Sequence, residues 1–130
     1  MELICRSCQG QQADGFTLNA AILKPSNFDP RKKYPVITYG YGNAGSQVVM
    51  NKWAFRSSGP ARDLFHKYMT ELGYIVFLID NRTTAGRGKL AKNMTYGHYG
   101  KYAVIDQIEG AKYLKSLPYV DPERVGFWGW

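Results

Sequence analysis

Residues 74–80 have the sequence YIVFLID, in which six apolar residues are followed by an aspartate. A short apolar run without alternating polar residues is typical of a strand buried on both faces, as in a parallel sheet. Gly73 directly precedes this run and closes a helical pattern that starts near Pro60. The apolar residues at helical spacing are Leu64, Phe65, Tyr68, Met69 and Leu72. The stretch therefore predicts a helix that leads into a central strand.

Three further strands are predicted on the N-terminal side of this unit. Residues 1–8 form a weak strand pattern, and residues 16–23 form a clearer one that ends before Pro25. Residues 35–39 are a short apolar strand that runs directly into glycines. These patterns place most of the expected strands before the central one.

The C-terminal side predicts a polar loop, a second helix and a last strand. The loop runs from Asp80 to about residue 100, and the helix spans about 102–117, where Pro118 stops it. One helix face is predicted to carry Val104, Ile108, Ala111 and Leu114. A turn at Asp121 and Pro122 then leads into a strand over 124–130.

Alternation of strands and helices predicts an α/β fold with a mostly parallel sheet and flanking helices. The expected order is strand, strand, strand, helix, strand, helix, strand. A chain of 130 residues has the size of one domain. Residues 13–130 carry the patterns that define this domain, and residues 1–12 remain unassigned.

Composition excludes several classes of protein. A hydrophobic content of 45%, with 15% aromatic residues, is typical of a folded domain rather than a disordered chain. The net charge of +7 is scattered along the sequence, so no nucleic-acid-binding face is predicted. No apolar run approaches the ~18 residues of a membrane-spanning helix, and the first residues show no signal peptide. These features leave the compartment undetermined.

Cys5 and Cys8 form a C-x-x-C pair, which raises the question of a metal site. Zinc sites need four ligands, and His66 and His98 lie far from the pair and from each other. A thioredoxin-like pair would follow a strand and open a helix. The two cysteines are therefore interpreted as incidental, and no metal is predicted.

The strand at 35–39 ends in glycines spaced as in the G-x-G-x-x-G of dinucleotide sites: Gly40, Gly42 and Gly45. Such a site needs a helix that begins at once and an acidic residue about 20 residues on. The next predicted helix begins only near Pro60, so a Rossmann-like site is kept as a second alternative. In a hydrolase the same loop would present Tyr41, whose O–H can donate to a developing oxyanion.

The other two strand ends carry weaker signals. The polar residues after Asp80 are expected to brace the site loop by hydrogen bonds, although a solvated loop has the same composition. The last strand runs into Gly129 and Trp130, as a strand does before the serine of G-x-S-x-G.

Taken together, these segments resemble the catalytic domain of the prolyl oligopeptidase family, most of all its dipeptidyl-peptidase IV-like branch. The matching motifs are Asp14-Gly15 with Leu18, Lys24-Pro25, Tyr34-Pro35, Tyr41-Gly42, Asp80 to Gly88, Asp106-Gln107, Tyr119-Val120-Asp121, Arg124-Val125 and Trp128-Gly129-Trp130. Asn43 and Ala44 stand where the family has Gly-Pro, and Thr83 stands where it has Gly. The resemblance covers about 13–130 and implies a partial α/β-hydrolase fold.

The resemblance also implies roles for particular residues. Tyr41 would be an oxyanion-hole donor, with Gly42, Asn43 and Arg82 as substrate-loop candidates. The nucleophile would follow Trp130, and the acid and base of the triad would follow later, so residues 1–130 contain none of the three. No cofactor or metal is implied.

The implied activity is that of a serine peptidase that cleaves peptides after Pro or Ala, with this portion inactive alone. The first alternative is a non-catalytic binding or assembly module built on half a hydrolase sheet. In either case the last strand would leave an exposed sheet edge through which the chain could form a homo-oligomer.

Overall fold

The computed structural model describes residues 16–41, 45–50 and 60–129. Within these residues four strands form one sheet in the order β1-β3-β2-β4. The strands are β1 (Asn19–Leu23), β2 (Tyr34–Tyr41), β3 (Ile75–Asp80) and β4 (Val120–Trp128). β2 is parallel to β3 and β4, whereas β1 is antiparallel to β3. The predicted α/β fold with a mostly parallel sheet is confirmed.

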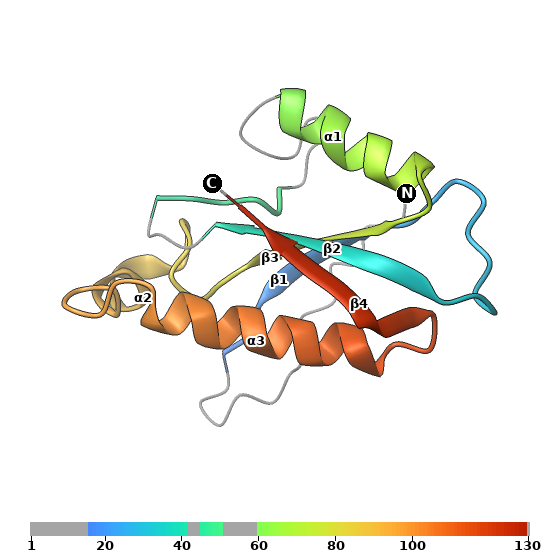
Figure 1. Ribbon diagram of the computed structural model, residues 1–130. Helices are drawn as coiled ribbons and strands as arrows, with labels where there is room; N and C mark the ends of the chain where they lie inside the picture. Colours follow the sequence, from blue (N-terminus) through green and yellow to red (C-terminus); the bar gives the residue numbers. More distant parts are fainter. Residues whose placement is uncertain (1–15, 42–44, 51–59, 130) are drawn as a thin grey trace.

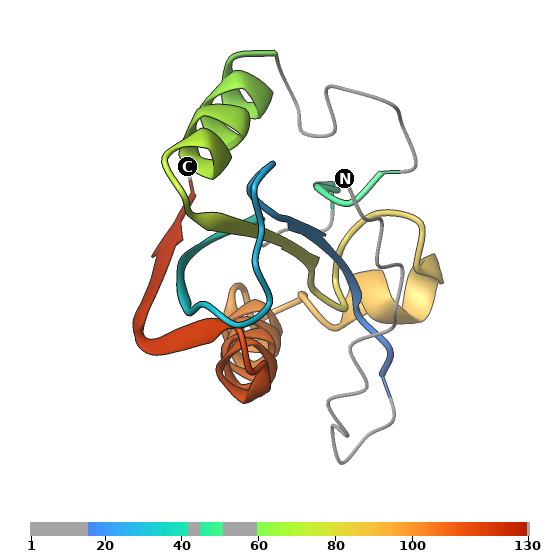
Figure 2. The same ribbon diagram turned by 90° about the vertical axis from the view of Figure 1, so that its right-hand side faces the viewer.

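The helices lie on both faces of this sheet. They are α1 (Pro60–Glu71), α2 (Gly88–Asn93) and α3 (Lys101–Ser116). α1 covers one face and α3 the opposite face, while α2 lies beyond the end of the sheet (Figure 1). The view turned by 90° shows the sheet between the two long helices (Figure 2). This layering buries the central strand from both sides.

β3 is the centre of two cores, one on each face of the sheet. Ile75, Phe77 and Ile79 pack in the cluster that contains Leu114 of α3. The alternate residues of β3, Val76 and Leu78, pack in the second cluster, on the α1 side. Every residue of β3 is buried, which confirms the two-sided burial predicted from its unbroken apolar sequence.

Gly73 ends the first helix, as its position predicts. Its φ of +88° lies in the left-handed region, which glycine adopts without strain. Its N–H donates to the carbonyl of Thr70 and that of Tyr74 to Met69, both at 3.0 Å. This pair of bonds is a Schellman motif, and it turns the chain directly into β3.

The apolar repeat of α1 correctly predicts a helix but does not mark its buried face. Four of its five apolar residues are exposed: Leu64, Phe65, Tyr68 and Leu72. The side facing the sheet carries His66 and Thr70, which are 1% and 7% exposed. His66 is held there by aromatic neighbours, with its ring centroid 5.2 Å from that of Tyr39 and 5.5 Å from that of Trp128.

α3 differs from expectation in the same way. Val104 and Ile108 are exposed, whereas Asp106 and Gly110 join Leu114 on the buried side. A Cβ on Gly110 would lie 2.8 Å from the Cδ1 atom of Ile79, so the helix lies close to the sheet at a residue without a side chain. Small and polar residues form much of this contact, and apolar periodicity does not detect them.

Three boundaries also differ from the sequence-based expectation. The segment expected to be a loop contains α2, of which only Ala91 is buried, so it lacks a clear helical repeat. β2 extends to Tyr41 because its last residues still pair with β3. β4 begins at Val120, and the predicted turn at Asp121 and Pro122 is an irregularity within it. The weak strand expected at 1–8 lies outside the described residues.

Candidate active site

Three carboxyl-terminal strand ends meet at one edge of the sheet. Tyr41, the last residue of β2, is paired with Asp80, the last residue of β3. On the other side, Tyr39 of β2 is paired with Trp128 at the end of β4. Function in open α/β sheets collects at such an edge, so the sequence-predicted site segments are adjacent in the fold.

Two glycines allow the strand ends to approach closely. A Cβ on Gly129 would lie 2.6 Å from the carbonyl oxygen of Gly40, which leaves no room for a side chain. On the α3 side, the amide nitrogen of Gln107 occupies the place that a Cβ on Gly40 would take. The end of β2 is thus enclosed by β4 and α3.

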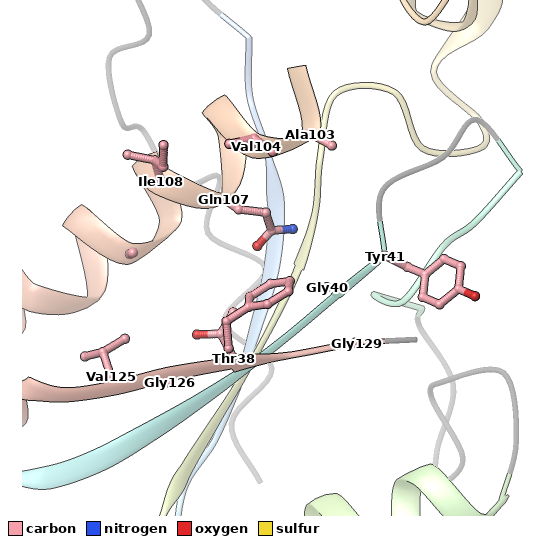
Figure 3. Close-up of a pocket in the computed structure, with 12 residues that line it drawn as sticks. Thr38, Gly40, Tyr41, Ala103, Val104, Gln107, Ile108, Val125, Gly126 and Gly129 are labelled. Carbon is pink, nitrogen blue, oxygen red and sulfur yellow. The ribbon is translucent and has the colours of Figure 1, made fainter. Parts of the chain in front are cut away.

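Tyr41 lies beyond this enclosure at the tip of β2. Its hydroxyl points away from Gln107 and α3 (Figure 3). The side chain is half-buried and packs against the second core cluster. Within the part of the chain that the structure describes, no hydrogen bond is made by the phenol oxygen. The ring is therefore supported by packing.

The end of β3 holds the backbone at Tyr41 and at residues 48–49, which follow it in sequence. The side-chain amide of Asn81 donates to the carbonyl oxygen of Tyr41 at 2.9 Å. The carboxylate of Asp80 accepts the N–H groups of Val48 at 2.7 Å and Val49 at 3.1 Å. Burial raises the pKa of Asp80, against the opposing effects of these two N–H groups and the charge of Arg87. The polar loop thus braces the site by hydrogen bonds.

Arg82, a predicted substrate-loop residue, is buried in an ion pair with Asp106 of α3. Its Nη2 atom lies 2.7 Å and its Nε atom 3.0 Å from the Oδ1 atom of Asp106. The backbone N–H of Arg82 donates to the other carboxylate oxygen at 2.7 Å. The guanidinium is 1% exposed and lies over the rings of Phe16 and Tyr102. In this structure Arg82 ties the loop after β3 to α3.

The remaining predicted site residues, Gly42 and Asn43, lie outside the described residues. Sequence reasoning did not single out Asp80 and Asn81 individually, although their place directly after a buried strand was a usable signal. Asp106 gave no signal beyond its place in the family motif. The sequence cannot show that it is buried opposite Arg82.

An aromatic cluster lies under the same edge on the α1 side. Tyr39, His66 and Trp128 pack against one another, and Arg62 donates to the hydroxyl of Tyr39. Burial is the largest cause that lowers the pKa of His66, which is thereby kept neutral near pH 7. Trp128 is therefore part of the support of the site rather than of an exposed surface.

An apolar groove of about 680 Å³ lies between α3 and the β2–β4 pair (Figure 3). Its lining includes Thr38, Val104, Ile108, Val125 and Phe127. In residues 16–41, 45–50 and 60–129 no three His, Cys, Asp or Glu side chains are grouped as metal ligands. No helix among the same residues is long and apolar enough to span a bilayer.

The dinucleotide alternative finds no support in this geometry. Gly40 lies within β2, and among the described residues the next helix begins at Pro60. Asp80, the acidic residue at the end of the following strand, uses both carboxylate oxygens on backbone N–H groups. A nucleotide ribose would have to displace these bonds.

Comparison with known proteins agrees with this arrangement. Residues 62–130, more than half of the chain, match the model of the prolyl oligopeptidase family. This chain belongs to the prolyl oligopeptidase family. A protein described as dipeptidyl-aminopeptidase B from Ajellomyces capsulatus is 43% identical over 118 residues. Its counterpart in Aspergillus clavatus is 40% identical over 123 residues.

Two solved structures of proteins described as dipeptidyl peptidases share the fold. Porphyromonas gingivalis dipeptidyl peptidase 4 superposes with a TM-score of 0.78 and 37% identity over 90% of this chain. A Bacteroides ovatus protein described as a dipeptidyl aminopeptidase IV superposes with a TM-score of 0.80, at 42% sequence identity over 96% of this chain. The α/β-hydrolase fold is thereby shown. The chain spans only 12–13% of the length of the curated relatives and 16% of the two solved chains.

Proposed function

We propose that this chain forms the oxyanion side of the active site of a dipeptidyl peptidase. The observation that carries the proposal is the place of Tyr41 at the end of β2, with its O–H directed away from Gln107 and α3 (Figure 3). Similarity to dipeptidyl peptidases supports the substrate class. A protein of this kind removes dipeptides from the N-termini of peptides, here after Pro or Ala.

In the proposed reaction, a serine attacks the carbonyl carbon of the scissile bond and a histidine accepts its proton. The carbonyl oxygen becomes an oxyanion, to which Tyr41 donates its phenolic O–H. Because the charge develops only in the transition state, this hydrogen bond is stronger there than in the bound substrate. Tyr41 therefore contributes to kcat rather than to affinity alone.

The residues of this chain do not complete the reaction by themselves. Its serines are Ser7, Ser26, Ser46, Ser57, Ser58 and Ser116, and none stands in a G-x-S-x-G sequence. The family pattern places the nucleophile directly after Trp130, and its base and acid still later. Residues 1–130 alone are therefore proposed to be inactive, since the acyl-enzyme cannot form without the nucleophile.

The test is a chimera of the Bacteroides ovatus relative in which the matched segment is replaced by this chain. We expect Tyr41→Phe to lower kcat by roughly 10²–10³ with KM nearly unchanged, because one oxyanion donor is lost while the ring stays packed. Tyr96→Phe, which alters a tyrosine that is 91% exposed, is the matched control. Steady-state hydrolysis of a dipeptide–chromophore substrate measures both.

Two results would contradict the proposal. A Tyr41→Phe chimera with kcat within about twofold of the parent chimera would make Tyr41 a packing residue, since a catalytic donor contributes far more. Hydrolysis of the same substrate by the 130-residue chain would contradict its proposed inactivity. Substrates with Pro, Ala and Leu in the second position test the proposed specificity in the same assay.

A further inference from the structure

Two consecutive residues at the end of β3 hold two chain segments that lie far apart from them in sequence. Asn81 donates a hydrogen bond to the carbonyl of Tyr41, and Asp80 accepts hydrogen bonds from two N–H groups of the segment 45–50. We infer that Asp80 and Asn81 are positioning residues, which fix Tyr41 relative to the 45–50 segment and so set the direction of its phenol. This inference rests on the proposed function of Tyr41 and extends it to groups that do not touch the substrate.

Asp80 connects the end of β3 to the 45–50 segment. Its Oδ1 atom accepts the N–H of Val48 and its Oδ2 atom accepts that of Val49, residues that precede it by 32 and 31 positions. Asp80 is 1% exposed, and Val48 is buried in the core cluster that Tyr41 packs against. Both oxygens of the carboxylate are thus used on the segment that supports Tyr41.

Asn81 fixes the near side through the backbone of Tyr41 itself. Its Nδ2 atom donates to the Tyr41 carbonyl at 2.9 Å. Its Oδ1 atom accepts the N–H of Thr83 at 2.9 Å and the Thr83 hydroxyl at 2.6 Å, which fixes the orientation of the amide. A second link joins the same turn to the supporting segment, from the N–H of Ala85 to the carbonyl of Ser46 at 3.1 Å.

The connection made by Asp80 is strongest in its ionised form. A carboxylate offers an acceptor on each oxygen, whereas a carboxylic acid or an amide presents a donor at one of them. That donor would face the N–H of Val48 or Val49, and one hydrogen bond would be replaced by a repulsive contact. Asp80→Asn therefore keeps the size of the side chain and removes half of the connection.

The surroundings of Asp80 determine when it ionises. Arg87 is the charged side chain that acts on it, and its Cα neighbours in the sheet are the neutral Asn19 of β1 and the phenol-bearing Tyr41 of β2. Burial outweighs Arg87 and the two N–H groups, and it leaves the pKa of Asp80 above its usual value. On acidification, Asp80 should therefore take up its proton earlier than an exposed aspartate.

The experiment on this chain is NMR of the backbone amides. In the wild type, the Val48 and Val49 amide signals should move together as Asp80 is protonated, at a pH above the ordinary aspartate range. In Asp80→Asn these amides should exchange with solvent about tenfold faster or more, with β3 amides unchanged. Asp121→Asn is the matched control, because Asp121 also accepts a backbone N–H, from Glu123 at 3.1 Å. It follows Val120, which pairs with Tyr34 at the end of β2 opposite to Tyr41.

The wild-type titration needs no folded variant, so the inference stays testable if Asp80→Asn does not fold. Val48 and Val49 amides that show no common titration, or that exchange unchanged in Asp80→Asn, would overturn it. In the chimera, Asp80→Asn should lower kcat about tenfold with KM nearly unchanged. If Tyr41→Phe loses kcat but the Val48 and Val49 amides do not respond to the protonation or replacement of Asp80, this inference alone is rejected. If the Val48 and Val49 amides do respond but Tyr41→Phe keeps full activity, the proposed function alone is rejected.

Discussion

Asp80 is a buried carboxylate whose charge is maintained at a cost to the fold. Since burial raises its pKa in the folded chain, the stability linked to its protonated form is fully present below the unfolded pKa. This stability is lost as the pH rises through the folded pKa. The charged form that Asp80 needs to hold Val48 and Val49 is thus the less stable one, as is typical where a group serves a site rather than stability.

At the scale of single residues, the sequence placed Tyr41 on a loop just after a strand over 35–39, because the apolar run stops there at glycines. The hydrogen bonds from Val48 and Val49 to Asp80 join residues 32 and 31 positions apart, and the sequence did not predict them. No local pattern encodes which backbone N–H groups a carboxylate meets across a sheet. The burial of Arg82 was hidden for the same reason, since its partner lies 24 residues away on α3.

The buried pair of Arg82 and Asp106 gives a prediction about stability. Asp106→Ala should destabilise the fold by about 3–5 kcal/mol, because it leaves the Arg82 guanidinium buried without this carboxylate. Removing both charges in Arg82→Met/Asp106→Ala should cost less than the sum of the single changes. Urea unfolding followed by circular dichroism measures each free energy of unfolding.

The pair of Lys112 and Glu109 on the same helix is the control for this measurement. Its atoms are also 2.7 Å apart, but the side chains are 68% and 27% exposed. Glu109→Gln should therefore change the free energy of unfolding by no more than about 1 kcal/mol. Equal costs for Asp106→Ala and Glu109→Gln would mean that burial does not govern the strength of the Arg82 pair.

At the scale of elements, the sequence located both long helices within a few residues but not the faces they bury. Apolar periodicity assumes that apolar residues face the core. In α1 the buried positions are His66 and Thr70, and in α3 they include Asp106 and Gly110. His66 is buried against aromatic neighbours, Asp106 in an ion pair and Gly110 by a close approach to the sheet. These contacts exist only in the assembled fold.

The end of α1 provides a test of an element boundary. Gly73→Ala should destabilise the fold by ~1–2 kcal/mol, because an L side chain is strained at a φ of +88°. No atom lies within 4 Å of the added Cβ, so the cost comes from backbone strain and not from a clash. Gly73→Asn should recover part of the loss, since Asn tolerates this conformation. Thermal unfolding of the three proteins would contradict this account if Ala and Asn cost the same.

At the scale of the whole molecule, β4 is one of the two edge strands of the sheet that the described residues form. β4 pairs with β2 on one edge and with no other described strand. Beside this free edge lies the groove lined by Val104, Ile108, Val125 and Phe127. A free strand edge next to an apolar groove favours pairing with another chain, so the predicted homo-oligomer remains the expectation for the isolated chain.

Phe127 is the residue through which this expectation is tested, because it is 60% exposed on β4 and lines the groove. In sedimentation, the average mass of the wild-type chain should rise with concentration. Phe127→Asp should shift it toward the monomer, since a carboxylate is costly to bury in an apolar contact. Tyr96→Asp is the control, as Tyr96 is 91% exposed and does not line the groove. A wild-type chain that stays monomeric at all concentrations would show that the free edge of β4 does not suffice for association. Equal shifts in both variants would place the contact away from the groove, because only Phe127 lies within it.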